Sequence, residues 1–236
     1  MKKFTFFLTT LCLLAFSSCG QKANMLITGT VDESLNGLEG KTLELTVANK
    51  KDTVQLKGLV RNHRFELCGH IDEALYTLVR WENVPPFLLV LEKGNINIDI
   101  KQSNGETEVR IGGTENNNLL QQFADELLEV ENDLEAVEQE DEQLAFDMFR
   151  SFIQGQISPI INTVAGRCLF RNYYYLFDLE EMEEFFANMT EQTLQDERIK
   201  RIHSAYELQR ATAEGEAYTD FSAPTPEGNI LPLSDI

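Results

Sequence analysis

The sequence predicts an α+β protein in which an antiparallel β-sandwich or open barrel is followed by a helical segment. Two observations carry this prediction. Residues 25–113 contain only short stretches rich in branched and aromatic side chains, and the hydrophobic period changes to that of a helix after Gly113. With 42% hydrophobic residues, the chain of 236 residues can bury a substantial core.

Eight short strands are expected in the first region. Asn95–Ile100 is the clearest, because its isoleucines alternate with polar residues and therefore share one face. Turn dipeptides such as Asn36-Gly37 and Pro85-Pro86 separate the segments, as in a sandwich or an open barrel. The expected strands cover residues 25–31, 42–47, 53–56, 64–69, 75–81, 87–91, 96–100 and 108–111.

A long amphipathic helix is expected after residues 112–114. Between Arg110 and Arg150 there are twelve acidic residues and no Lys or Arg, so the outward face of this helix is strongly negative. A solvated face explains this charge better than a calcium site, since no loop has EF-hand spacing. Steps of three and four residues place six apolar side chains on one stripe, namely Leu120, Phe123, Leu127, Val130, Leu134 and Val137.

Further helices are expected toward the C-terminus. An aromatic cluster between them could line a ligand pocket, although packing between helices is the expected role. The cluster contains Phe170, Tyr173, Tyr174, Tyr175 and Phe177. The expected helices are 144–154, one that opens at Ser158-Pro159 and runs through Cys168, one that opens at Asp178 with a capping box to Glu181, and one from 195 to 213.

The N-terminus has the order of an export signal. Met1-Lys2-Lys3 is cationic, residues 4–16 are uncharged, and Ser17-Ser18 stands directly before Cys19. Small residues before a cysteine are typical of a lipoprotein signal, so cleavage before Cys19 and acylation of that cysteine are expected. The uncharged run is too short to span a bilayer as a helix. The alternative is an ordinary secretory signal in which Cys19 is incidental.

Composition restricts the partners and the location. Removing residues 1–18 deletes two lysines and no acid, so the formal charge changes from −19 to −21. Such a chain repels phosphate backbones, which argues against a nucleic-acid partner. The expected partners are the membrane, through the lipid, and another envelope protein. Residues 20–24 contain no acidic cluster, which favours the periplasmic side of the cell envelope over the cell surface.

No catalytic site is expected within these residues. His63, His70 and His203 lack the spacing of metal ligands, and neither a phosphate loop, a dinucleotide-binding glycine pattern nor a nucleophile elbow is present. No cofactor is implied. Once Cys12 has been removed and Cys19 acylated, Cys68 and Cys168 remain, and they could form a disulfide. Neither has a Cys-x-x-Cys partner in the sequence.

The last 22 residues resemble the opening of a thioredoxin-like domain of the AhpC/TSA and TlpA-like kind. Gly215, Asp220-Phe221, Gly228 and Leu233-Ser234-Asp235 have the order and spacing of that family. With a lipoprotein signal and a β domain that opens with Ile27–Val31, the chain is similar to the N-terminal half of envelope thiol-disulfide oxidoreductases of Bacteroidetes. In those proteins, this module is catalogued as a domain of unknown function.

The resemblance implies an order of segments and a choice of functions. The segments are a signal peptide (1–18), a tether (19–24), a β-sandwich (25–113), a helical segment (114–214) and the start of a thioredoxin-like domain (215–236). The family's Cys-x-x-Cys follows the Leu-Ser-Asp element and is not among the printed residues. The expected function is a partner-binding or positioning module without a redox site. The alternatives are a fragment of an active oxidoreductase, or a surface ligand- or glycan-binding lipoprotein that uses Trp81.

Overall fold

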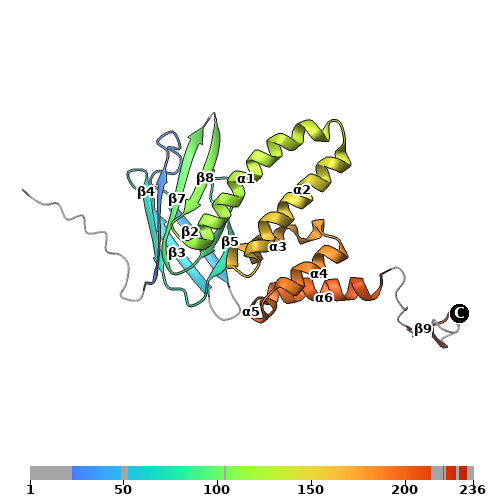
Figure 1. Ribbon diagram of the computed structural model, residues 1–236. Coiled ribbons are helices and arrows are strands. Elements are labelled where there is room, and N and C mark those ends of the chain that lie inside the picture. Colours follow the sequence, from blue (N-terminus) through green and yellow to red (C-terminus); the bar gives the residue numbers. More distant parts are fainter. Residues whose placement is uncertain are drawn as a thin grey trace, which may run out of the picture. The chain divides into compact units, whose positions relative to one another are not determined.

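The computed structural model describes residues 23–48, 53–103, 105–213, 220, 222–226 and 229–232 (Figure 1). The expected signal peptide and Cys19 lie outside the described residues. The expected α+β class is confirmed, because strands β1–β8 come first and helices α1–α6 follow. The chain forms two compact units. The helical unit contains Leu75–Leu78, Leu88–Val90 and the chain from Glu115 onward, and the β unit contains the remaining residues up to Thr114.

The strands lie close to their expected positions. β1, β4 and β6 have the expected bounds, and β7 is longer at both ends. Residues 80 and 81, expected in a strand, follow the end of β5. The strands are β1 (Met25–Val31), β2 (Thr42–Ala48), β3 (Thr53–Leu59), β4 (Arg64–Gly69), β5 (Leu75–Val79), β6 (Phe87–Leu91), β7 (Gly94–Ser103) and β8 (Glu106–Gly112).

The β unit is built on a four-stranded sheet with the order β4-β1-β7-β8 (Figure 1). β1 pairs antiparallel with β4 and β7 pairs antiparallel with β8, whereas β1 and β7 are parallel. The arrangement therefore differs from the expected antiparallel one at the pairing of β1 with β7. The chain passes through β2–β6 before β7 begins beside the start of β1, and such a return produces a parallel pair. β2 and β3 form a separate antiparallel hairpin.

The core of the β unit follows the alternation in the sequence. Ile96, Ile98 and Ile100 of β7 are fully buried. Trp81 is also core: its ring contacts Phe65 and Phe87 edge-on, with both centroid distances 5.6 Å. The Trp81 indole N–H donates to the Glu44 carbonyl at 2.9 Å. A tryptophan held in this way is not available to stack on a sugar.

The helical unit begins with the expected long helix. On α1 (Glu115–Glu138), Leu120, Phe123 and Leu134 of the predicted stripe are buried and the other three are partly buried. The capping box at Asp178 and Glu181 is confirmed. The last helix begins after Asp196 rather than at residue 195. The other helices are α2 (Glu142–Ile157), α3 (Val164–Tyr173), α4 (Leu179–Asn188), α5 (Glu191–Leu194) and α6 (Glu197–Ala211).

The helix expected to open at Ser158-Pro159 opens later. Ser158–Ile160 is a single 3-10 turn, and α3 starts at Val164 after the N-cap Thr163. The Thr163 hydroxyl accepts from the Gly166 N–H at 3.0 Å and donates to the Ile160 carbonyl at 2.8 Å. A Cβ at Gly166 would lie 1.9 Å from that carbonyl oxygen, so only glycine permits this close return of the chain. The stronger cap at Thr163 therefore overrides the Ser-Pro signal.

Two contacts hold β5 and β6 within the helical unit. The buried Asn117 side chain of α1 accepts from the Val90 N–H at 2.9 Å and donates to the Val90 carbonyl at 2.8 Å. The Tyr76 ring lies 4.4 Å from the Arg198 guanidinium and 5.4 Å from that of Arg171. Arg198 also donates to the Tyr76 carbonyl at 3.5 Å. The two short strands thus have polar partners as well as an apolar core.

Replacing Asn117 by alanine should destabilise the helical unit strongly. Both Val90 groups would lose their partner in a buried place, so we expect a loss of about 2–4 kcal/mol in the free energy of unfolding. Glu135→Ala, at an exposed position of the same helix, should change it by less than about 0.5 kcal/mol. Denaturant unfolding followed by circular dichroism measures both. Equal stability of the two variants would show that the two hydrogen bonds between the Asn117 amide and Val90, which we call the amide clamp, contribute little.

Candidate functional site

The aromatic cluster is mainly core. Phe170 and Phe177 are buried and contact Phe185, with centroid distances of 5.0 and 4.8 Å. Tyr174 and Tyr175 are 36% and 70% exposed. The buried rings fill the space between helices and the tyrosine hydroxyls lie at the rim, as expected for helix packing rather than for the lining of a pocket.

The two cysteines do not form the disulfide considered from the sequence. Cys168 is a free, fully buried thiol on α3. Cys68 lies on β4 and is not paired with Cys168. Burial raises the pKa of the Cys168 thiol to about 12, although Arg171 and Arg198 partly oppose this shift. A thiol of such a high pKa has almost no thiolate at neutral pH, so Cys168 is not suited to thiol exchange.

The three histidines lie on different elements of the chain. His63 is in the turn before β4, His70 faces Asp72 at 3.1 Å just after β4, and His203 packs against the Phe186 ring on α6. Within the described residues, no group of three or more His, Cys, Asp or Glu side chains is placed to hold a metal ion. The same part of the chain has no helix that is long and apolar enough to cross a membrane.

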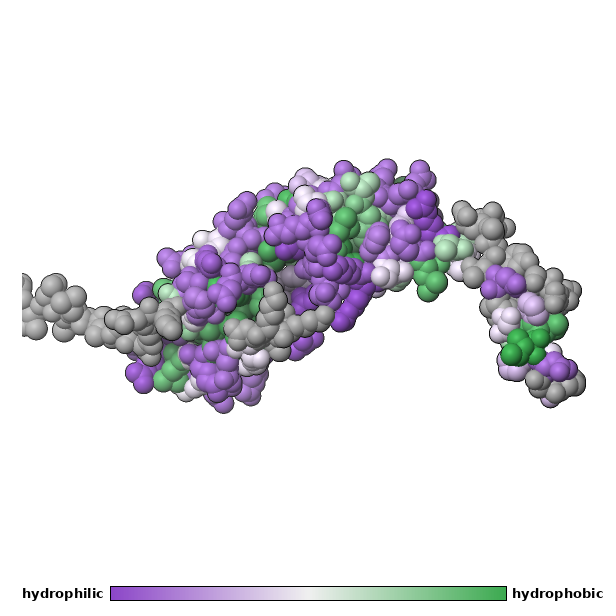
Figure 2. Space-filling view, turned by 90° about the horizontal axis from the view of Figure 1, so that it is seen from below, coloured by the Kyte–Doolittle hydropathy of each residue, from purple (hydrophilic) through white to green (hydrophobic). Residues whose placement is uncertain are grey.

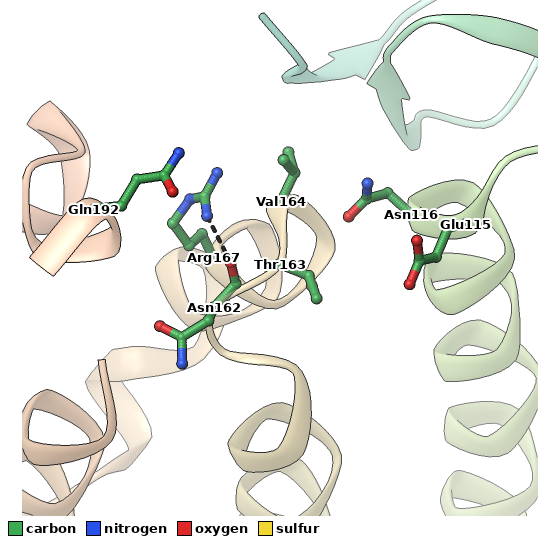
Figure 3. A pocket seen from close by; sticks show the side chains of 7 residues that line it. All are labelled: Glu115, Asn116, Asn162, Thr163, Val164, Arg167 and Gln192. Carbon is green, nitrogen blue, oxygen red and sulfur yellow. Dashed lines mark hydrogen bonds between the residues drawn. The ribbon is translucent and has the colours of Figure 1, made fainter. Parts of the chain in front are cut away.

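A pocket of about 290 Å³ lies between the first turns of α1 and α3, beside α5. Figure 3 shows Arg167 and Gln192 pointing toward one another, and Asn116 directed toward the start of α3. Two helix N-termini and an arginine are features that could attract an anion. Sequence patterns did not predict this pocket, because its residues come from three separate segments. They are Glu115, Asn116, Asn162, Thr163, Val164, Arg167 and Gln192.

Several polar groups of this pocket have partners within the protein. Asn116 accepts from the Ala165 N–H at 2.9 Å, and Asn162 accepts from the Thr190 N–H at 2.7 Å. Arg167 donates to the Asn162 carbonyl at 3.0 Å, and its Nε lies 3.5 Å from an Asp196 carboxylate oxygen. The pocket is therefore in part a joint between helices, although the buried Arg167 Nε has no hydrogen-bond partner among the described residues.

The turn at Asn62 and His63 also has the geometry of an anion site, and the Glu39 carboxylate of the same chain occupies it. Asn62 and His63 both have positive φ, at 51° and 58°, and form a two-residue hairpin turn between Arg61 and Arg64. Their backbone N–H groups donate to the two oxygens of Glu39, each at 3.0 Å. The His63 N–H is the main cause that lowers the pKa of Glu39 below its ordinary value of 4.5, and the Asn62 N–H adds to it. Paired amides of this kind are an anion nest, here closed by a carboxylate of the same chain.

Most of the coloured surface on the face in Figure 2 is hydrophilic, and apolar side chains form smaller patches on it. Near the C-terminus, β9 (Ser222–Pro224) pairs antiparallel with β10 (Ile230–Pro232). The Thr225 N–H donates to the Asn229 carbonyl at 2.7 Å, next to the paired strands. Gly228, Phe221 and residues 233–236 are not among the described residues.

Residues 25–120 match the family model described as "Domain of unknown function (DUF4369)". The match runs from β1 into the first turns of α1 and therefore includes Asn117. The expectation of an N-terminal module of unknown function is confirmed at this level. No curated protein and no solved structure matches the chain significantly.

The Cys168 thiol should be unreactive in the folded protein. At pH 8, four pH units below a pKa of about 12, only about one molecule in ten thousand carries the thiolate. We expect an aromatic disulfide reagent to modify Cys168 only as fast as the helical unit unfolds, and at once in denaturant. The Cys168→Ala variant, which lacks this thiol, shows which part of the reagent's reaction comes from Cys168. Rapid modification of the native protein would contradict the buried placement.

Replacing Glu39 by glutamine should remove a pH-dependent part of the stability. Because the folded state lowers the Glu39 pKa, its stabilising effect is present above pH 4.5 and is lost as the pH falls through the lowered value. We therefore expect Glu39→Gln to be less stable than the wild type at pH 7 and to approach it near pH 3. Denaturant unfolding at a series of pH values measures this difference. A constant difference at all pH values would show that the carboxylate charge has no role in the nest.

Proposed function

We propose that this chain is a lipoprotein of the cell envelope, anchored by lipid on Cys19, that serves as the partner-binding and positioning module of a thioredoxin-like thiol-disulfide oxidoreductase. The observation that carries the anchor is the short distance along the chain between Ser17-Ser18-Cys19 and the folded domain. The sheet begins at Met25, only six residues after the cysteine. The acylated end would thus join the domain almost directly.

A binding role fits the chemistry of the described residues better than a catalytic one. The free thiol at Cys168 is buried and has a raised pKa, and several polar groups of the pocket at Arg167 are used to join helices. Thiol exchange needs an accessible thiolate with a resolving cysteine beside it. On this proposal, the module holds and orients a partner, while the redox cysteines belong to a thioredoxin-like domain.

The C-terminal strand pair, β9 and β10, favours a second candidate, in which these residues are part of an active oxidoreductase. Ile230 is 75% exposed and Leu231 36% exposed on β10. In a complete thioredoxin-like domain, following strands would cover such side chains, and the Cys-x-x-Cys would lie on the turn between the first core strand and its helix. A glycan-binding role has lost its support, because Trp81 is only 8% exposed.

Acylation of Cys19 can be tested on the protein purified from membranes of its own host. Cleavage after Lys22 should release the peptide Cys19–Lys22 with the mass of its acyl groups added. A Cys19→Ser variant should lack the modification and leave the membrane fraction. Because the lipid is attached through sulfur, an acylated Cys19 cannot form a disulfide. An unmodified Cys19, or one linked to another cysteine under non-reducing conditions, would overturn the proposal.

The intact mass of the same sample distinguishes the two candidates. A mass equal to residues 19–236 plus acyl groups is expected for a positioning module that acts with a separate redox partner. A mass larger by a thioredoxin-like domain would show that the module and the catalytic cysteines share one chain. In that case, the active oxidoreductase would replace the separate positioning module as the proposed function. The lipid anchor is part of both proposals.

A further inference from the structure

We infer that one defined end of the four-stranded sheet, the end at Asn24, faces the lipid headgroups. This inference rests on the proposed acylation of Cys19. It goes beyond that proposal, because a lipid on a long tether would leave every face of the domain equally free. The structure limits the length of the tether, because hydrogen bonds hold Asn24 in the folded domain.

Asn24 is held to two neighbouring segments by four hydrogen bonds. Its backbone N–H donates to the Gly69 carbonyl, and its carbonyl accepts from the Gly94 N–H, both at 3.0 Å. Its side chain accepts from the Ile71 N–H at 2.9 Å and donates to the Ile71 carbonyl at 2.8 Å. The folded domain therefore begins at Asn24, before the first residue of β1.

The remaining tether is short. Five residue steps separate Cys19 from Asn24, and an extended chain covers at most about 3.6 Å per step, so Asn24 lies within about 18 Å of the acylated cysteine. The cysteine lies at headgroup level, since its acyl chains enter the hydrocarbon layer. The strands are longer than the tether: β7 has ten residues and spans about 30 Å.

The register of the sheet identifies the near and far ends. β1 and β7 start at the near end, at Met25 and Gly94, while β4 ends there at Gly69. The exposed Lys93 and the segment from His70 to Glu73 belong to this end. The far end carries Ser103 and the Asn62-His63 turn with Glu39. Lys93 would meet the headgroups, and the far end would remain accessible to a protein partner.

The orientation can be measured by energy transfer to the membrane. A fluorescent amino acid is placed at Lys93 in one variant and at Ser103 in another, at opposite ends of β7, and each acylated protein is bound to phosphatidylethanolamine–phosphatidylglycerol vesicles that contain a headgroup-labelled acceptor lipid. Both positions are exposed. We expect transfer from position 93 to exceed that from position 103 on the order of several-fold, because the ends differ by about 30 Å.

A lengthened tether is the matched control. Twenty Gly and Ser residues inserted between Lys22 and Ala23 have a mean span of about 25 Å, which should reduce the difference between the two positions. Equal transfer from both positions in bound protein with the native tether would overturn the orientation and leave the anchor intact. Failure of the acylated protein to float with the vesicles, like a Cys19→Ser variant, would overturn the anchor and the orientation with it.

Discussion

The helical unit depends on asparagine side chains in the first turn of α1 that take the place of backbone partners. Asn117 is fully buried and satisfies both the N–H and the carbonyl of Val90 in β6. The preceding residue, Asn116, accepts from the Ala165 N–H at the start of α3. Two consecutive residues thus fix a strand and a helix that are far apart in the sequence. A buried strand edge without such partners would be costly, and an amide presents a donor and an acceptor at the spacing of a peptide group.

The same device occurs at the N-terminal end of the β unit. Asn24 contacts Ile71 with both its oxygen and its nitrogen, as Asn117 does with Val90. Asn162 distributes its two groups between Thr190 and Asn188 in the helical unit. Each clamp joins segments separated by more than twenty residues, so the polar side chains, as well as the apolar core, determine which segments become neighbours.

Much of the fold could be predicted from the sequence because it is encoded locally. The alternation in β7, the stripe of α1 and the box at Asp178 and Glu181 each depend on residues within a few positions of one another. Partners distant in sequence could not be predicted in this way. The parallel pairing of β1 with β7 and the clamp of Asn117 on Val90 have no local signal, since polar residues before an apolar stripe indicate only a helix start. The nest at Glu39 was missed for the same reason.

The position of β1 in the sheet would also suit it to carry the proposed anchor. β1 pairs with β4 on one side and with β7 on the other, so a pull on its N-terminus acts along a central strand. The bonds of the antiparallel β1–β4 ladder run across the strand direction, and a force along β1 would load them together rather than one after another. The Asn24 side chain adds two bonds at the point where that force enters. An edge strand paired on one side would resist the same force with a single ladder.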